Sequence, residues 1–292
     1  MLKRLRIRYE GTVQGVGFRP HIYRLARANH LKGWVNNDSS GVTVEVEGEP
    51  GAIDQFIKES VDKAPVLARI KKVEQKEIAT IFEKDFVIRE SERNDVASTQ
   101  VSADAATCPD CLNELFDPKD RRFRYPFINC TNCGPRYTII FSIPYDRPYT
   151  TMKTFKMCPD CELEYNSPAD RRFHAQPNAC PVCGPELILL DHKGKKIPGD
   201  PIKNAIENLR AGKIVAVKSL GGFQLAVDAQ NDEAVKTLRA RKIREDKPFA
   251  LMAFDLETIR KYVFVSKAEE ELLLSPEKPI VLLKKLPGAG LA

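Results

Sequence analysis

The sequence predicts an α+β protein of several domains, and three observations support this prediction. Residues 1–91 show a strand–helix–strand–strand–helix–strand pattern, residues 108–190 hold every cysteine in a duplicated array, and residues 200–292 mix helix and strand patterns. Polar stretches rich in turn residues separate these parts, at 92–107, which we expect to be a linker, and at 191–200. A chain of 292 residues is long enough for two or three domains.

The first part is predicted to be a ferredoxin-like sandwich. Alternating or compact apolar patterns predict strands at residues 5–9, at 42–46, around 73 and at 86–88. Apolar residues at helical spacing predict amphipathic helices around 18–26 and 53–61. In the strand at 42–46, valines alternate with Thr43, Glu45 and Glu47, so we expect it to bury only one face. We interpret the order as βαββαβ, which is that of the ferredoxin-like fold.

A glycine-rich turn over residues 11–19 joins the first strand to the first helix. Glycines at such a turn let successive backbone N–H groups point into one concavity, beside the positive end of a helix. This arrangement suits a phosphate group, and Arg19 adds a planar, bidentate donor at the start of the helix. On its own a glycine-rich turn is weak evidence, because many are only tight turns.

The run Val13-Gln14-Gly15-Val16-Gly17-Phe18-Arg19, followed by Gly33-Trp34-Val35-Asn36-Asn37, resembles the acylphosphatase signature over residues 1–91. The resemblance implies that Arg19 and the loop backbone hold the phosphoryl group and that Asn37 orients the attacking water. The implied loop residues are Gln14, Gly15, Val16, Gly17 and Phe18. An acyl phosphate has a good leaving group, so positioning and charge stabilisation suffice. From the residues alone, Asn37 could instead be a turn residue before 38–41.

All eight cysteines lie in four C-x-x-C pairs that repeat at an offset of fifty residues. Fourteen of the 28 positions from 108 to 135 match their counterparts, including Asp-Arg-Arg-Phe at 120–123 and 170–173. The spacing C-x2-C-x18-C-x2-C lies in the zinc-ribbon range, and four thiolates suit a tetrahedral zinc ion. The predicted ligands of two structural zinc ions are Cys108, Cys111, Cys130, Cys133, Cys158, Cys161, Cys180 and Cys183.

Disulfides or redox chemistry are the alternative to zinc, since the number of cysteines is even. The start of the sequence, Met1–Arg6, lacks the apolar region of a secretory signal, which argues against an oxidising compartment. A redox role would need only one active pair, whereas four pairs in tandem favour a structural role. Closed sites with four thiolates leave no open coordination position, so we do not expect this module to be catalytic.

The composition predicts a soluble, cytoplasmic protein. No run approaches 18 apolar residues, so no membrane span is expected. The net charge of +6 is spread over the chain and argues only weakly for nucleic acid as a partner. The cluster at 121–124 could contact phosphates, but a solvated surface is the simpler interpretation.

The last part is predicted to be an α/β domain. Helices are expected over residues 202–209 and 234–238, with Gly212 ending the first, and strands at 214–217, 225–227, 249–252 and 279–283. A dense cationic run, Arg241–Pro248, precedes the third of these strands. Taken alone, this run is most simply a solvated charged face.

This part resembles the YrdC-like family of nucleotide-dependent carbamoyl-transfer enzymes. Lys242-x-Arg244-x-x-Lys247-Pro248 matches the K-x-R-x-x-K-P element of that family, and residues 218–222 occupy its substrate-loop position. The resemblance implies that a basic wall binds ATP and the carbamoyl-bearing substrate. The residues implied are Lys218, Gly221, Gly222, Lys242, Arg244 and Lys247. The Ser/Thr-rich nucleotide element of the family is absent, so we expect a truncated domain.

The order of the three parts resembles the N-terminal part of the HypF-type hydrogenase-maturation carbamoyltransferases. That resemblance implies hydrolysis of carbamoyl phosphate to carbamate, which ATP converts to carbamoyl-adenylate. The carbamoyl group then passes to the C-terminal cysteine of a partner protein and becomes the cyanide ligand of [NiFe] hydrogenase. This chain is expected to retain the hydrolysing half. Because carbamate is short-lived in water, the two sites are expected to share an enclosed path.

Several alternatives stay open at this point. Each zinc ion could take the cysteines of one repeat, or a crossed arrangement could join the outer pairs and, separately, the inner pairs; the ribbon-like spacing slightly favours the first. The chain could also be a zinc-containing RNA-binding protein of tRNA modification, since YrdC relatives act there, which a steep salt dependence of RNA binding would reveal. A third possibility is a plain acylphosphatase with appended scaffolding.

Overall fold

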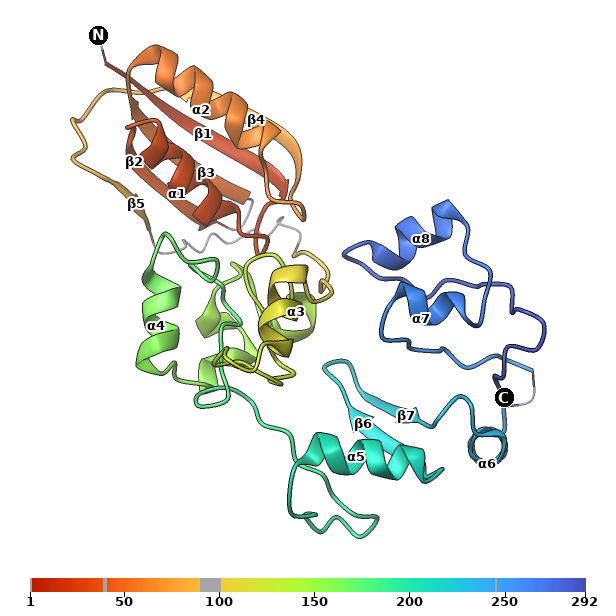
Figure 1. Cartoon of the computed structure of the whole chain (residues 1–292). Helices are drawn as coiled ribbons and strands as arrows, with labels where there is room; N and C mark the ends of the chain where they lie inside the picture. Colours follow the sequence, from red (N-terminus) through yellow and green to blue (C-terminus); the bar gives the residue numbers. More distant parts are fainter. Residues whose placement is uncertain (1, 39–40, 90–100, 245) are drawn as a thin grey trace. The chain divides into compact units, whose positions relative to one another are not determined.

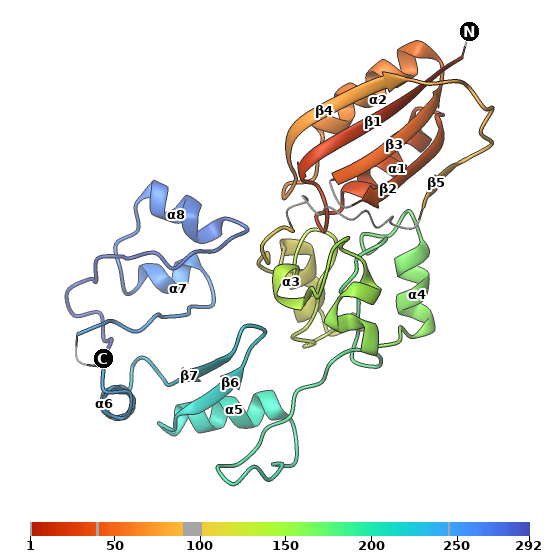
Figure 2. The same cartoon turned by 180° about the vertical axis from the view of Figure 1, so that it is seen from behind.

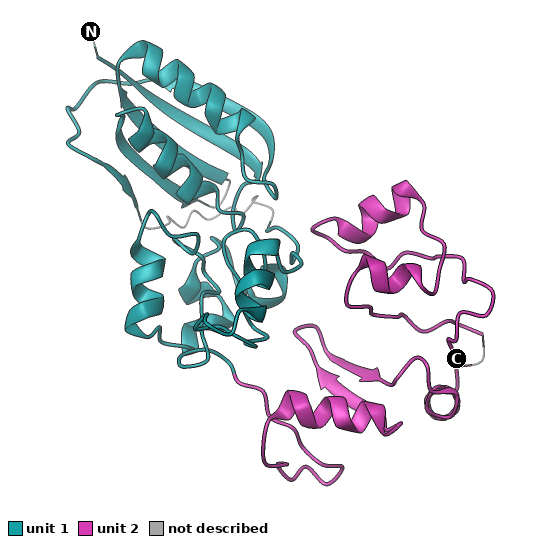
Figure 3. Cartoon of the chain, in the orientation of Figure 1, with its two compact units in different colours: residues 1–185 teal, residues 186–292 magenta. Residues whose placement is uncertain are grey.

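The computed structural model describes residues 2–38, 41–89, 101–244 and 246–292. The chain forms two compact units, residues 1–185 and 186–292 (Figure 3). The first unit holds an α/β sandwich and the cysteine array, and the second holds the remaining helices and a β-hairpin.

The sandwich has a five-stranded sheet in the order β4-β1-β3-β2-β5, with α1 and α2 against one face (Figures 1 and 2). Its elements are β1 (Lys3–Thr12), α1 (Phe18–Ala28), β2 (Lys32–Asp38), β3 (Gly41–Gly48), α2 (Pro50–Asp62), β4 (Arg69–Glu77) and β5 (Phe86–Ile88). The first four strands pair antiparallel, and β5 adds a short parallel edge beside β2. The predicted βαββαβ fold is confirmed.

Alternation along the strands builds the core of the sandwich. Ile7 of β1 lies opposite Val44 of β3, and both are fully buried. Phe18 from α1 and Phe56 from α2 close the core from the helical side. This packing fixes the start of α1 against the end of β2, and the candidate site lies there.

The second face of β3 is also buried, so the expectation of a half-buried strand was wrong for Glu45 and Glu47. Arg4 on the neighbouring strand donates to Glu45 at 2.6 Å, and Arg6 does so at 2.7 Å. Glu47 accepts from the backbone N–H groups of residues 81 and 82, at 2.9 and 2.8 Å. The period-two pattern could not show that the segment before β5 covers this face.

Burial opposes the charged form of Glu45, but hydrogen bonds from Arg4 and Arg6 overcome it and lower the pKa of this carboxyl. We expect Glu45→Gln to lower the free energy of unfolding by about 2 kcal/mol at neutral pH, because Arg4 then faces a neutral acceptor. Since the folded-state pKa lies below the ordinary 4.5, this contribution is complete above that pH and is lost as the pH falls through the lowered pKa.

Urea unfolding of the native chain and of Glu45→Gln, at neutral pH and at about pH 3, measures this effect. The difference in stability should shrink at the lower pH. Glu74→Gln, at a carboxylate that is half exposed on β4, serves as the matched control. A difference of equal size at both pH values would contradict the assignment.

The cysteine array folds as two copies of one unit. Helices α3 (Pro109–Phe116) and α4 (Pro159–Asn166) occupy equivalent positions, and each follows a cysteine that serves as its N-cap. The repeat extends to the backbone, since Arg124 and His174 both have positive φ. Short 3-10 turns lie between the copies, at η1 (Tyr137–Ile139), η2 (Arg147–Tyr149) and η3 (Thr151–Thr154).

The predicted linker at 92–107 lies partly outside the described residues, which resume at 101. The described part packs between the sandwich and the array. Val101 forms a β-bridge with Gln14, and Ala105 exchanges backbone hydrogen bonds with Gly134, at 3.1 and 2.9 Å. Residues 101–105 therefore tie the two parts together.

In its described residues, the second unit contains four helices and the hairpin of β6 (Val215–Lys218) and β7 (Phe223–Ala226). The helices are α5 (Pro201–Arg210), α6 (Asp232–Arg241), α7 (Leu256–Arg260) and α8 (Lys267–Leu274). Side-chain caps explain where they begin: Asp200 caps α5, and Ser266 with Glu269 forms a capping box on α8. None of the described helices has the length and apolar character needed to cross a membrane.

The predicted strands at 249–252 and 279–283 are wrong, because neither segment pairs as a strand. Neither has a neighbouring strand among the described residues that would bond its backbone. Apolar side chains along them stay in solvent, with Met252 95% and Leu282 84% exposed. An apolar run becomes a strand only where a partner satisfies its N–H and C=O groups.

Candidate functional site

The turn between β1 and α1 has the backbone of an anion-binding nest. Gly15 and Gly17 adopt left-handed conformations, with φ of 72° and 75°, and Gly17 is the N-cap of α1. No side chain caps this helix, and the N–H groups of Val16, Gly17 and Phe18 donate to no acceptor in the described parts of the chain. Orphan N–H groups at a helix N-terminus favour an anion.

The side chains of this turn point elsewhere. Val16 and Phe18 are buried in the core of the sandwich, so only their backbone can serve a ligand. The Gln14 side chain donates to the carbonyl groups of Asp38 and Gly41, at 2.6 and 2.8 Å. Gln14 therefore ties the loop to the turn between β2 and β3.

Arg19, the second residue of α1, lies beside Asn37 at the end of β2. The hydrogen-bonding network orients the Asn37 amide with Oδ1 toward the guanidinium, where it accepts from Nε at 3.1 Å and from Nη2 at 3.2 Å. This orientation leaves the Nδ2 group as the donor on the other side of the amide. Both residues line one pocket, so the structure brings the two predicted catalytic residues together.

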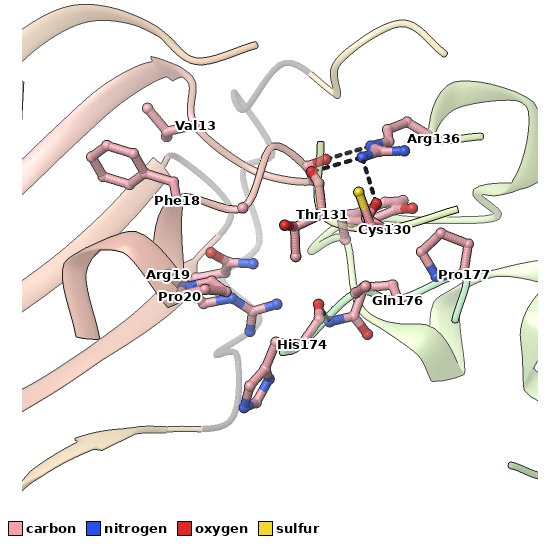
Figure 4. A pocket seen from close by; sticks show the side chains of 15 residues that line it. Val13, Phe18, Arg19, Pro20, Cys130, Thr131, Arg136, His174, Gln176 and Pro177 are labelled. Atoms are coloured by element: carbon pink, nitrogen blue, oxygen red, sulfur yellow. Dashed lines mark hydrogen bonds between the residues drawn. The ribbon is translucent and has the colours of Figure 1, made fainter. Parts of the chain in front are cut away.

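The opposite wall of this pocket comes from the cysteine array (Figure 4). The pocket-lining residues from that part are Cys130, Thr131, Arg136, Tyr145, His174, Ala175, Gln176 and Pro177. The sandwich and the array thus share one site. That the metal module is not itself catalytic stays a prediction, although its residues line the pocket.

Arg136 connects this wall to the glycine-rich turn between β1 and α1. It is buried, and its Nε donates to the carbonyl of Gly15 at 2.5 Å. Its other nitrogens donate to the carbonyls of Cys133 at 2.6 Å and Thr131 at 2.9 Å, and Figure 4 shows this side chain at the edge of the pocket. One guanidinium therefore bridges the loop and the turn that carries two cysteines.

Gly15 and Gly17 are also required because residues of the cysteine array pack closely against them. A Cβ on Gly15 would lie 3.2 Å from the ring of Tyr145, and one on Gly17 would lie 3.1 Å from the Cβ of Thr131. Both positions also have positive φ, which other residues adopt at a cost. The array would have to move to accept a larger residue at either position.

His174 lies on the same wall. Burial, followed by the nearby charge of Arg19, lowers the pKa of His174 to about 4. The imidazole is therefore neutral at neutral pH. Its backbone carbonyl accepts from Gln176 at 2.9 Å, and Gln176 in turn accepts from Tyr165 at 3.0 Å.

The eight cysteines form two clusters that fit tetrahedral metal sites. Four thiolates at about 2.3 Å from zinc lie about 3.8 Å from one another. Neighbouring sulfur atoms lie 3.5–3.8 Å apart in one cluster and 3.6–3.7 Å apart in the other. These distances also exclude disulfides, whose sulfurs lie about 2.05 Å apart.

Each cluster takes its cysteines from one repeat, so the local grouping is the one observed. The first joins Cys108, Cys111, Cys130 and Cys133, and the second joins Cys158, Cys161, Cys180 and Cys183. No ligand position is left open in either tetrahedron. The chemistry of the donor set therefore fits structural zinc.

Arginines from each repeat donate hydrogen bonds to the cysteine cluster of the other repeat. Arg122 is buried and pairs with Glu164 at 2.5 Å, and Arg121 donates to the sulfur of Cys161 at 3.2 Å. In return, Arg172 pairs with Glu114, and Arg171 donates to the sulfur of Cys111 at 3.1 Å. The repeated Asp-Arg-Arg-Phe run is explained by this exchange, and the interpretation as a solvated surface was wrong for Arg122.

In the second unit, the residues predicted to bind nucleotide lie in two segments, the hairpin turn and the cationic run. Lys218 lies at the end of β6, with its Nζ 5.5 Å from the centre of the Phe223 ring, and Gly221 and Gly222 form the turn that follows. Lys242 and Lys247 are exposed, and Arg244 donates to the carbonyls of Lys247 and Pro248, both at 3.0 Å.

No hydrogen bond or ion pair joins the hairpin turn to the cationic run among the residues described in this unit. Glu245, within the run, lies outside them.

Sequence comparisons agree with the geometry of the first site. The acylphosphatase family model matches residues 5–88. An acylphosphatase of Thermotoga maritima is 39% identical over 89 residues, which are 30% of this chain and 98% of that protein. The N-terminal segment belongs to the acylphosphatase family. The matched range includes the glycine-rich turn, Arg19 and Asn37.

The rest of the chain also matches known families. The model described as HypF finger matches residues 107–140 and 157–190, one match for each four-cysteine cluster. The model of the Sua5, YciO and YrdC proteins, described as telomere recombination, matches residues 207–291.

Longer relatives cover all three parts together. The chain is 52% identical over 288 residues to carbamoyltransferase HypF2 of Cupriavidus necator, covering 98% of this chain and 36% of that protein. A probable carbamoyltransferase HypF of Methanocaldococcus jannaschii is 46% identical, with 97% and 37% covered. The predicted resemblance to HypF-type carbamoyltransferases is confirmed. The chain spans a little over a third of the length of these relatives.

A solved structure extends this likeness to the fold. The crystal structure of full-length HypF in the phosphate- and nucleotide-bound form has a TM-score of 0.94 and 51% identity, covering 98% of this chain and 38% of that one. The HypF of T. kodakarensis has a TM-score of 0.89 and 47% identity, with 99% and 37% covered.

Sequence patterns did not predict the part of the pocket wall that comes from the cysteine array. Tyr145 and Asp146 lie between the two matched repeats, in residues that have no counterpart in the other copy, and Arg136 lies opposite Glu186. Thr131 and His174 sit where the two copies differ, opposite proline and arginine respectively. Positions where the two copies differ were therefore the sequence signal that could have indicated these pocket residues.

Proposed function

We propose that the pocket of the acylphosphatase segment hydrolyses carbamoyl phosphate to carbamate and phosphate. The observation that supports this most is the position of Arg19. It lies at the head of an uncapped helix, beside a nest of N–H groups and against the Asn37 amide. An arginine fork and a helix N-terminus together suit a phosphoryl group.

In this proposal Arg19 and the N–H groups of residues 15–18 bind the phosphoryl oxygens. The Nδ2 group of Asn37 orients a water molecule, whose oxygen attacks phosphorus. The bond between phosphorus and the bridging oxygen breaks, and carbamate leaves with its electron pair. The proton lost by the water passes to phosphate or solvent. Preorganised donors on the developing charge supply most of the acceleration in such a reaction.

We propose carbamoyl phosphate as the substrate because the long relatives are carbamoyltransferases. In the whole natural protein we propose that ATP converts the carbamate to carbamoyl-adenylate. The carbamoyl group would then pass to the C-terminal cysteine of a partner protein, in the cytoplasm, during [NiFe] hydrogenase maturation.

Within this chain we propose the following parts. Residues 1–91 are the hydrolase domain and 92–107 a linker, 108–190 bind two zinc ions, and 200–292 are part of the nucleotide domain. Lys218, Gly221, Gly222, Lys242, Arg244 and Lys247 are proposed to contribute to the nucleotide and carbamoyl site.

Release of phosphate from carbamoyl, acetyl and benzoyl phosphate, corrected for spontaneous breakdown, tests the proposal on the zinc-loaded chain. We expect the carbamoyl compound to be the preferred substrate. Asn37→Ala should lower the rate strongly, whereas Asn113→Ala, an exposed position on α3, should not. Equal or better turnover of acetyl and benzoyl phosphate would favour a plain acylphosphatase, and no turnover would contradict the proposal.

A further inference from the structure

The predicted phosphate-binding arginine is held by a carboxylate from outside the acylphosphatase segment. Arg19 Nη2 lies 2.6 Å from Asp146 Oδ1, with only 8% and 18% of the two side chains exposed. Asp146 belongs to the stretch between the two cysteine repeats and is the N-cap of η2. The family match of the acylphosphatase segment ends at residue 88, so this contact is an addition to that segment.

We propose that Asp146 is a positioning residue that holds Arg19 in place and weakens the binding of the phosphate product. This inference rests on the proposed function. Asp146 neutralises part of the guanidinium charge, and its carboxylate competes with phosphate oxygens for the same N–H donors. A phosphate dianion that reaches Arg19 also meets a like charge close by, which in a partly buried site is unfavourable. Product release is therefore faster than from an arginine without this partner.

Two side chains hold Arg19 in position, so variants of one can separate the effect of its charge from its effect on the position of Arg19. Asn37 accepts from Nε and Nη2 at 3.1 and 3.2 Å, and Asp146 accepts from Nη2 at 2.6 Å. Asp146→Asn keeps an oxygen acceptor of the same size and removes only the charge. Asp146→Ala removes both the charge and the support. Asp146→Glu keeps the charge on a longer side chain.

The experiment measures binding of inorganic phosphate to the zinc-loaded chain by calorimetry, together with inhibition of carbamoyl phosphate hydrolysis. We expect Asp146→Asn to bind phosphate about tenfold more tightly, because the like charge is gone. KM should fall with it, and kcat should also fall because the product leaves more slowly. Asp146→Ala should bind phosphate less tightly than Asp146→Asn, and Asp146→Glu should stay close to the native chain.

Asp110→Asn removes an exposed carboxylate at the start of α3 and is the matched control, with no change expected. Unchanged or weaker phosphate binding in Asp146→Asn would overturn the inference. Because phosphate binding needs no turnover, the inference can fail or stand separately from the proposed hydrolysis. If Asp146→Asn does not retain both zinc ions, the comparison of Asp146→Glu with the native chain decides.

Discussion

Arg19→Ala should lower kcat/KM for hydrolysis of carbamoyl phosphate by about a thousandfold. Removing one preorganised donor from such a site typically costs a hundredfold to a thousandfold. Here the substitution removes a fork of donors together with the positive charge. It also leaves the pocket with the Asp146 carboxylate but without the guanidinium that it contacts at 2.6 Å. The pocket then repels the phosphate that it is proposed to bind.

Initial rates of phosphate release measure this effect. Arg27→Ala is the matched control, because Arg27 lies in the last turn of the same helix with its side chain 56% exposed. We expect the control to keep the native rate and both variants to keep two zinc ions. An Arg19→Ala rate within threefold of the native rate would show that hydrolysis occurs elsewhere.

Cys130→Ser should remove one of the two zinc ions and loosen the wall of the pocket. Binding of structural zinc contributes roughly 10–16 kcal/mol in small zinc peptides, so loss of one thiolate is severe. Cys130 is fully buried in the core of the array. Its carbonyl also accepts from Arg136, at 3.3 Å, and Arg136 holds the phosphate loop through Gly15. Hydrolysis should therefore fall together with the zinc content.

Zinc content by mass spectrometry and phosphate release on the same samples test this coupling. Cys183→Ser in the second cluster is the matched comparison. It should also lose one zinc ion but lower hydrolysis less, because Arg136 donates to carbonyls of the first cluster and, among the described residues, to none of the second. The sandwich should stay folded in both variants, since it has its own core. Equal loss of hydrolysis in the two variants would contradict the role given to Arg136.

Much of the local organisation could be predicted from the sequence. The glycine-rich turn, Arg19 and Asn37 meet in the structure because the βαββαβ order places the start of α1 beside the end of β2. The spacing of the cysteines favoured the local grouping, since each set of four lies within one short repeat. Both predictions depend on residues that are near in sequence or on one topology.

Contacts between distant segments could not be predicted in this way. Asp146 reaches Arg19 across 127 positions, and no periodic pattern indicates which parts of a chain meet. The same limit explains Glu45, whose burial depends on a segment that covers its strand. It also explains the apolar runs at 249–252 and 279–283, which have strand composition but no strand partner among the described residues.

The cysteine array lines the pocket of the acylphosphatase segment in addition to forming two candidate metal sites. The first cluster includes Cys130 and Cys133, whose backbone carbonyls accept hydrogen bonds from Arg136. Through Arg136 and Asp146 the array supports both the phosphate loop and the arginine beside it. The zinc-binding module and the acylphosphatase segment therefore form one site.

The central claim is that this shared pocket directs water to the phosphorus of carbamoyl phosphate. Hydrolysis by the native chain in water enriched in oxygen-18, followed by phosphorus NMR, tests it most directly. We expect one labelled oxygen in each phosphate released, and we expect Arg19→Ala to release phosphate no faster than the blank. Phosphate without the label, or equal release by Arg19→Ala, would contradict it.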